Sequence, residues 1–219
     1  MLSAALRKAS SDPVRVLLLG AHADDIEIGC GGTVLELARR YPRLSVHWVV
    51  FTADPTRAHE ATSAAGRFLH GVTEREVLIE RFRDGYLPYE GDRVKDYFEA
   101  LKARVSPDLI FTHYRDDGHQ DHRLVCELTW NTFRDHLILE YEIPKYDPDI
   151  GSPNVFVHLD DALAETKVRY LLESYPSQAS RPWFTGDAML AIMRLRGIDA
   201  RAIRYAEAFY CRKLILAPP

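Results

Sequence analysis

Residues 14–25, VRVLLLGAHADD, are the stretch of this sequence that decides the fold we expect. Residues 14–19 are mostly apolar and include β-branched valines, which is typical of a buried β-strand. His22, Asp24 and Asp25 follow on the turn that leaves this strand. In an open α/β sheet, ligands and catalytic groups collect at such turns. The stretch therefore predicts a buried strand with a functional site at its end.

Strands and helices alternate along the rest of the chain. We expect strands at residues 14–19, 44–52, 77–79, 108–112, 154–159 and 205–216, and helices at 33–40, 57–69, 93–104, 124–139 and 162–174. This alternation implies βαβ units, because a parallel strand pair needs a crossover connection. The 219 residues suffice for a two- or three-layer core, and no repeat or linker divides them. The sequence thus predicts one α/β domain, 1–219, with a Rossmann-like three-layer fold and a mainly parallel sheet.

A second polar cluster follows the strand expected at residues 108–112. It reads Asp116-Asp117-Gly118-His119-Gln120-Asp121-His122. Because the carboxyl ends of parallel strands lie at one edge of a sheet, we expect this cluster to meet the first. The two clusters are then parts of a single site.

The residue types in these clusters suit a metal centre. Two histidines and a carboxylate, with one open position for water, form a known catalytic zinc arrangement. His22, Asp25 and His122 are the ligands we expect. Such a metal lowers the pKa of its water from ~15.7 to ~7. Asp24, adjacent in sequence but pointing elsewhere, is then suited to accept the proton of that water as general base.

Three other residues of the second cluster and its strand need an assignment. His119 precedes His122 by one helical turn, so it is placed to face a substrate and to stabilise an oxyanion or protonate a leaving amine. Asp121 is suited to hold the tautomer of His119. His113 is a competing ligand that we rank below His22 and His122, as a polar residue around the site.

Composition narrows the classes of function. A net charge of -4 leaves no basic surface of the kind that nucleic-acid-binding proteins carry. No apolar run has the length of a membrane span or a signal peptide. The three cysteines, Cys30, Cys126 and Cys211, form no CxxC pair, which favours a reducing compartment. We therefore expect a cytoplasmic protein with a small-molecule substrate, without nucleic-acid or membrane partners.

Residues 141–153 interrupt the alternation of strands and helices. A loop of this length in a compact domain favours a lid or a binding loop. A surface excursion without function explains it equally well. If the loop borders the site, it is the segment that decides substrate specificity.

Both polar clusters resemble motifs of the LmbE-like (PIG-L) deacetylase family. Ala21-His22-Ala23-Asp24-Asp25, with Glu27 and Gly29 after it, is similar to the opening motif of that family. Gly118-His119-Gln120-Asp121-His122 is similar to its second motif, His-x-Asp-His. Two further segments extend the resemblance toward the C-terminus, namely Lys167 with Tyr175-Pro176-Ser177-Gln178, and Tyr205-Ala206-Glu207-Ala208-Phe209.

The resemblance implies a zinc-dependent hydrolase, with one zinc ion per chain, that removes the acetyl group from an N-acetylated sugar. Substrates of that family include N-acetylglucosaminyl conjugates, and a nucleotide sugar or a glycan or natural-product precursor would fit this class. The family's roles place the metal on His22, Asp25 and His122, and give catalytic roles to Asp24, His119 and Asp121. By position, Arg57 and Asp84 resemble family residues that contact the substrate. The resemblance leaves a homo-oligomer open.

The sequence departs from the family pattern at four places. Ala23 stands where proline is usual, Tyr175 replaces a frequent histidine, and Asp117 occupies a place where some members have a tyrosine that helps the oxyanion. Glu27 follows the acids one residue later than the glutamate often found there. None of these departures removes a proposed metal ligand.

Three rival hypotheses remain from the sequence. Gly29-x-Gly31-Gly32 follows the first strand, as a phosphate-binding loop of a Rossmann-type nucleotide-binding protein would, although the third glycine of that fingerprint is missing. The same metal site could serve a hydratase acting on an oxo-acid, since the family includes one. A metal-bound protein without catalysis is disfavoured because Asp24 and His119 are both present.

Overall fold

The computed structural model describes residues 6, 12–202 and 204–215. Strand β1 (Val14–His22) lies inside a seven-stranded sheet of order β3-β2-β1-β4-β5-β7-β6. Its parallel neighbours are β2 (Leu44–Thr52) and β4 (Leu109–His113), and the parallel part continues with β3 (Glu74–Ile79) and β5 (Leu137–Tyr141). The sheet ends with β7 (Tyr205–Tyr210), antiparallel to β5, and β6 (Val155–Leu159), antiparallel to β7.

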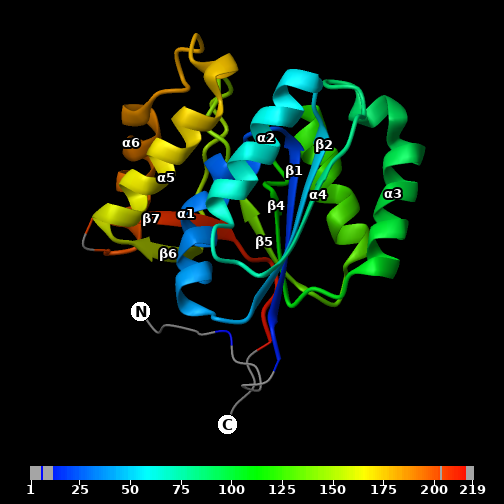
Figure 1. The fold of residues 1–219 in the computed structure, drawn as a ribbon, viewed down its shortest axis with the longest axis horizontal. Coiled ribbons are helices and arrows are strands. Elements are labelled where there is room, and N and C mark those ends of the chain that lie inside the picture. Colours follow the sequence, from blue (N-terminus) through cyan, green and yellow to red (C-terminus); the bar gives the residue numbers. More distant parts are fainter. Residues whose placement is uncertain (1–5, 7–11, 203, 216–219) are drawn as a thin grey trace.

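Helices cover both faces of this sheet, which gives three layers (Figure 1). One face carries α1 (Asp25–Arg40), α2 (Pro55–Phe68), α5 (Asp161–Ser174) and α6 (Gly186–Asp199), and the other carries α3 (Gly91–Arg104) and α4 (Gln120–Thr132). Short 3-10 helices, η1 (Leu87–Glu90) and η2 (Pro176–Gln178), precede α3 and follow α5. The predicted α/β fold with a mainly parallel sheet is confirmed.

Strand β1 supplies the core on both faces. Because successive side chains of a strand point to opposite faces, Val16 and Leu18 pack under the α1 side, and Leu17 and Leu19 under the α3–α4 side. All four are at most 1% exposed. This two-sided burial explains why the strand reads as a continuous apolar run.

Helix α1 begins at Asp25, not at residue 33 as the sequence suggested. Its glycines lie inside the helix, where they let neighbouring side chains approach. A Cβ on Gly29 would lie 2.2 Å from the Tyr141 ring, and one on Gly31 would lie 2.7 Å from the Phe68 ring. Each glycine in a helix costs about 1 kcal/mol, and for this reason the sequence predicted a later helix start. The close packing that these glycines allow outweighs that cost. The glycines therefore serve helix packing and form no loop around a phosphate.

A buried ion pair joins α1 to two distant elements. Lys167 of α5 donates to the carbonyl of Ile28 at 2.6 Å and to Glu207 of β7 at 2.6 Å. The Glu207 carboxylate accepts the backbone N–H groups of Gly32 at 2.8 Å and Thr33 at 2.6 Å. These are backbone groups that α-helical hydrogen bonding would use, so the pair is built into the helix itself. Lys167 and Glu207, singled out by the C-terminal resemblance, thus fasten the first half of α1, the helix that begins at Asp25.

Three other expectations are corrected. Residues 137–141 form β5 and not the end of a helix, since α4 stops at Thr132. Helix α6 was not predicted, because Leu195 and Ile198 remain exposed while Met193 is buried, which blurs the helical apolar pattern. Strand β7 ends at Tyr210, short of residue 216, which lies outside the described residues, as does most of the N-terminal segment 1–11.

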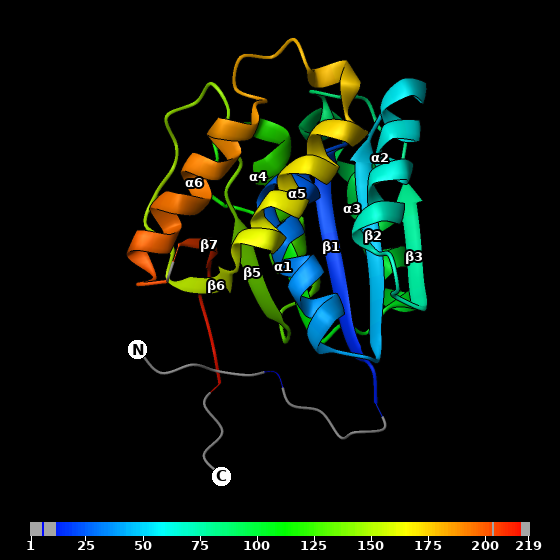
Figure 2. The ribbon, with the colours of Figure 1, turned by 60° about the vertical axis from the view of Figure 1, so that its left-hand side comes forward.

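The two ends of the described chain leave the sheet on the same side (Figure 2). The site turns lie at the opposite edge, where β1 and β4 end. Within residues 6, 12–202 and 204–215, no helix combines the length and the apolar character that crossing a membrane requires.

Candidate metal centre and active site

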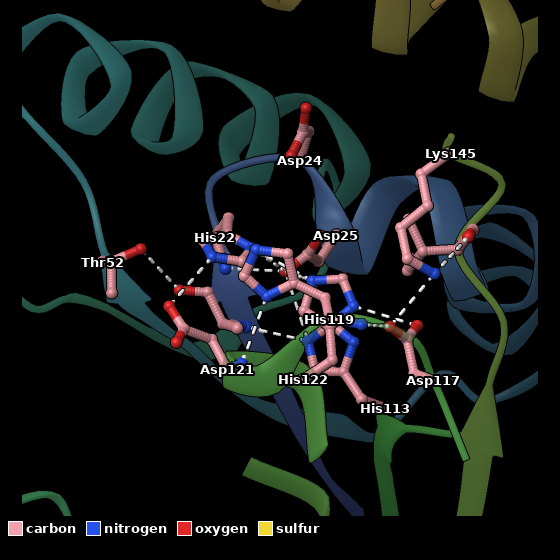
Figure 3. A network of polar contacts seen from close by, with 12 residues as sticks. His22, Asp24, Asp25, Thr52, His113, Asp117, His119, Asp121, His122 and Lys145 are labelled. Atoms are coloured by element: carbon pink, nitrogen blue, oxygen red, sulfur yellow. Dashed lines mark hydrogen bonds and ion pairs between the residues drawn. The ribbon is translucent and has the colours of Figure 1, made fainter. Parts of the chain in front are cut away.

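The two polar clusters meet at the carboxyl edge of the sheet. His22 is the last residue of β1, and Asp25 is the first residue of α1. His122 lies in the first turn of α4, directly after the turn that leaves the neighbouring strand β4. Figure 3 shows the three side chains pointing toward one another.

Three atoms of these side chains form a compact triangle. His22 Nδ1 lies 3.0 Å from His122 Nε2 and 3.3 Å from Asp25 Oδ2, and the last two atoms are 3.5 Å apart. The ligand atoms of a tetrahedral zinc ion stand ~3.3 Å apart, given bonds of about 2.0–2.1 Å. The three side chains are 18%, 4% and 2% exposed in the order His22, Asp25 and His122. Donor chemistry and spacing therefore fit a divalent cation of zinc's size.

In His22 and in His122, the ring nitrogen that lies outside the triangle has a carboxylate neighbour. His122 Nδ1 lies 3.0 Å from Asp117 Oδ2, and His22 Nε2 lies 3.3 Å from Asp121 Oδ2 and 3.2 Å from Asp84 Oδ1. Such partners fix the tautomer and orientation of histidines that bind metals. Burial lowers the pKa of His122 to about 3, so its ring stays neutral at neutral pH, as a metal ligand must be. Burial opposes a charge on His22, but Asp25 and the other carboxylates raise its pKa above the usual value.

Asp117 is the residue of this group whose contribution the sequence did not reveal. It is 2% exposed, and its Oδ1 accepts the backbone N–H of His119 at 2.7 Å. Burial alone would raise the pKa of Asp117, but the His122 ring and the His119 N–H hold it well below its usual range. The carboxylate is therefore charged. Its place in the Asp116–His122 cluster was the available signal.

The expected partnership of Asp121 and His119 takes another form. The Asp121 carboxylate faces His22 and accepts the N–H groups of Gly85 at 2.8 Å and Leu87 at 3.2 Å. The bond between the two residues runs from the Asp121 backbone N–H to His119 Nδ1, at 3.2 Å. Since His119 Nδ1 accepts, the proton of the neutral ring sits on Nε2. His119 is thus oriented by the start of α4 and not by a carboxylate.

The rings of His119 and His113 both lie next to the triangle. The His119 ring centroid is 4.7 Å from those of His22 and His122. His113, fully buried, stacks on His122 at 3.9 Å. Its Nε2 is 3.2 Å from Asp25 Oδ2, but the same nitrogen accepts the backbone N–H of Ala21 at 2.9 Å. Because its lone pair is engaged in that bond, we rank His113 below His22 and His122 as a ligand. Asp25, His113 and His122 are nevertheless close enough to form a second group that could hold a metal.

Asp24 is turned away from the triangle (Figure 3). Its backbone has a φ of 134°, a conformation that side-chain-bearing residues rarely adopt. Its Oδ2 lies 3.0 Å from the Arg57 guanidinium. Burial raises the pKa of Asp24 to about 7, although Arg57 opposes that rise. The carboxyl is therefore poised to take up and release a proton near neutral pH.

The two residues expected to contact substrate differ in their surroundings. Asp84 is 78% exposed at the rim of the site, so it is open to a ligand. Arg57 is only 15% exposed and is engaged by Asp24, by the carbonyl of Ala23 and by Ser177 Oγ at 3.3 Å. Glu60 accepts both the N–H and the Oγ–H of Ser177, at 2.9 Å and 2.6 Å. Arg57 thus links Asp24 to the Ser177 segment.

Tyr175 and Glu27 make a second link to that segment. The Tyr175 hydroxyl donates to Glu27 Oε1 at 2.6 Å, and the Arg57 guanidinium lies 5.1 Å from the Tyr175 ring centroid. Burial raises the pKa of Glu27 to about 8, with the Tyr175 hydrogen bond acting against it. The tyrosine that replaces a frequent histidine of the family therefore braces the first site turn.

Comparison with known families gives one matching model. Residues 17–133 match the PIG-L family, described as GlcNAc-PI de-N-acetylase. This range contains both polar clusters, from His22 to Asp25 and from Asp117 to His122. The protein is also 27% identical over 156 residues to the uncharacterized deacetylase YaiS of Escherichia coli K12, covering 66% of this chain and 82% of that relative.

Solved structures share the fold. The N,N'-diacetylchitobiose deacetylase of Pyrococcus horikoshii matches with a TM-score of 0.71 at 22% identity, covering 91% of this chain and 84% of the other. GalB, the 4-carboxy-2-hydroxymuconate hydratase of Pseudomonas putida KT2440, matches with a TM-score of 0.74 at 16% identity, covering 94% and 98%. At these identities the likeness concerns the fold alone.

Proposed function

The chain belongs to the PIG-L (LmbE-like) deacetylase family, and from this premise we propose that it is a zinc-dependent hydrolase of N-acetylated sugars. The observation that carries the metal dependence is the triangle of His22 Nδ1, Asp25 Oδ2 and His122 Nε2, with sides of 3.0–3.5 Å. These residues would hold one zinc ion per chain. When bound, the ion supplies Lewis-acid polarisation of the acetamide carbonyl and lowers the pKa of water.

Asp24 and His119 carry out the two proton transfers of the proposed reaction. Asp24 accepts the proton of the attacking water, which its pKa of about 7 allows at neutral pH. His119 carries its proton on Nε2, since Nδ1 accepts the Asp121 N–H, and it therefore has a proton to give to the departing amine. Asp117 and Asp121 orient His122 and His22.

Family membership and the residues at the rim of the site support the proposed substrate class. A family model described as GlcNAc-PI de-N-acetylase and a structural neighbour that is an N,N'-diacetylchitobiose deacetylase both support an N-acetylglucosaminyl-type sugar. Asp84, exposed beside His22, is placed to accept a hydrogen bond from a sugar hydroxyl. Arg57 contributes by holding the side chain of Asp24, the proposed general base.

Two alternatives carry less support. Packing of Gly29 and Gly31 against Tyr141 and Phe68 accounts for the glycines that suggested nucleotide binding. An oxo-acid hydratase with the same fold exists, so the fold does not separate hydration from deacetylation. The PIG-L match favours deacetylation.

The test is release of acetate and of free amine from a panel of N-acetylated mono- and disaccharides. The proposal predicts equal amounts of both products, loss of activity after chelator treatment and recovery when zinc is returned. A protein that ignores the whole panel when fully loaded with zinc, yet adds water to the double bond of an unsaturated oxo-acid, would establish the hydratase alternative instead.

A further inference from the structure

The segment 142–151, which we call the strap, is the larger part of the connection between β5 and β6 and is fastened at both ends. Glu142 Oε2 is 2.7 Å from Arg196 of α6, and Glu142 Oε1 accepts the Gly151 N–H and the Tyr210 hydroxyl, each at 2.7 Å. Arg196 also donates to the Gly151 carbonyl at 3.0 Å. The strap is thus tied to α6 and β7 at both of its ends.

One side chain of the strap reaches into the site. Lys145 Nζ lies 3.0 Å from Asp117 Oδ1 and also pairs with Asp149 of the strap. The Lys145 side chain is 10% exposed. Asp149 Oδ2 accepts the backbone N–H of Gly118 at 2.6 Å, so the strap contacts both Asp117 and the residue that follows it. Figure 3 shows Lys145 descending from the strap to Asp117.

Asp117 connects Lys145 to His122. Its Oδ2 lies 3.0 Å from His122 Nδ1, while its Oδ1 faces Lys145. The other nitrogen of the same ring, His122 Nε2, belongs to the triangle that fits a metal. A continuous series of contacts therefore runs from Lys145 through Asp117 to His122, whose Nε2 is a proposed ligand atom.

Without the ammonium group of Lys145, Asp117 would not keep its position against His122. Asp117 and Asp149 both face Lys145 Nζ, so they lie on either side of one positive charge. Removing that charge leaves two carboxylates close together, one of them 2% exposed. Asp117 keeps its bonds to the His119 N–H and to His122, but it now faces the charge of Asp149 with no cation between them. Repulsion between the two carboxylates then shifts Asp117 and weakens its contact with His122.

We propose that Lys145 is a positioning residue that holds Asp117 against His122 and thereby sets the affinity of the centre for zinc. The inference rests on the proposed function, because it takes His122 as a metal ligand. It assigns the strap a role in metal retention. Lys145 itself touches neither the metal nor the substrate.

The test measures the dissociation constant of Zn²⁺ by competition with a chromophoric chelator, on purified full-length protein. Lys145→Met should weaken Zn²⁺ binding about tenfold, and Asp117→Asn by about 10- to 100-fold, the range seen for partners of metal-binding histidines. Lys145→Arg keeps the charge and should recover most of the Zn²⁺ binding that Lys145→Met loses.

Two comparisons separate positioning from general damage to the strap. Glu142→Gln weakens the bond of the strap to α6 but leaves Lys145 on Asp117, so Zn²⁺ affinity should match wild type. If Lys145 acts through Asp117, adding Lys145→Met to Asp117→Asn should cause no further loss. The KM for an N-acetyl sugar should be the same in Lys145→Met and wild type once both are saturated with zinc.

Each other outcome has a definite meaning. A wild-type protein that binds no Zn²⁺ refutes the proposed function. Tight wild-type binding with no change in Lys145→Met refutes only the role of Lys145, as does an equal loss in Glu142→Gln. A raised KM at unchanged affinity would make Lys145 a substrate contact and overturn the inference. Should Lys145→Met fail to fold, Lys145→Gln carries the same comparison against Lys145→Arg.

Discussion

Oδ2 of Asp24 lies 3.0 Å from Nη2 of Arg57, so the proposed general base is held by a guanidinium from the first turn of α2. The contact fixes the direction in which Asp24 points and counters the rise in pKa that burial causes. Asp24 also has a φ of 134°, so backbone strain is concentrated at the residue that we assign to proton transfer.

Replacing Asp24 by asparagine should abolish turnover while leaving the metal in place. The amide keeps the size of the side chain but accepts no proton, and general bases contribute about 10²- to 10⁴-fold to rate. The measurement is kcat for acetate release together with the zinc content of the same preparation. Turnover within a few-fold of wild type would rule out Asp24 as the base.

The strain at Asp24 predicts a trade between stability and activity. Asp24→Gly should be more stable than Asp24→Ala by roughly 1 kcal/mol or more, since glycine adopts a φ of 134° without the cost borne by other residues. Both variants remove the partner of Arg57, so apart from one methyl group their difference isolates the backbone. Urea denaturation of the two proteins measures it. Equal stabilities would mean that no strain is stored there.

The buried pair of Lys167 and Glu207 should matter far more than an exposed pair. Lys167→Met leaves the Glu207 charge buried and unpaired, and should lower the free energy of unfolding by about 3–5 kcal/mol. The control is Arg67→Met, which breaks the ion pair with Glu173. The side chains of Arg67 and Glu173 are 39% and 48% exposed. That loss should stay below about 1 kcal/mol. Similar losses in the two variants would argue against an ion pair built into α1.

The glycines of α1 and α2 should respond in opposite directions. Gly29→Ala places a methyl group 2.2 Å from the Tyr141 ring and should cost roughly 1–3 kcal/mol of stability. Gly66→Ala in α2 meets no atom within 4 Å and should gain about 0.5–1 kcal/mol through better helix propensity. Thermal unfolding of both variants measures this. A neutral Gly29→Ala would leave the glycines without a packing role.

Much of this architecture could be predicted because it depends on local patterns. The apolar run of β1 and the polar turns after β1 and β4 are visible in the sequence, and the rule that parallel strands end at one edge brings the turns together. Strand β5 escaped prediction because a short apolar run fits a helix or a strand equally well, and its burial between β4 and β7 decides the outcome.

Side-chain partners were harder to predict than side-chain types. Asp121 was expected beside His119 because the two are close in sequence, but the first turn of α4 directs its carboxylate to His22 and the N–H of Gly85. The contact of Lys145 with Asp117 joins segments far apart in the chain, so no spacing in the sequence announces it. Such contacts become visible only when the chain is folded.

The central claim is that His22, Asp25 and His122 hold one metal ion, and elemental mass spectrometry of the purified protein tests it most directly. The account predicts about one zinc per chain, lost in Asp25→Ala and in His122→Ala, and retained in the His113→Asn control. Metal-free protein even after reconstitution with zinc, or equal metal content in Asp25→Ala and wild type, would contradict it.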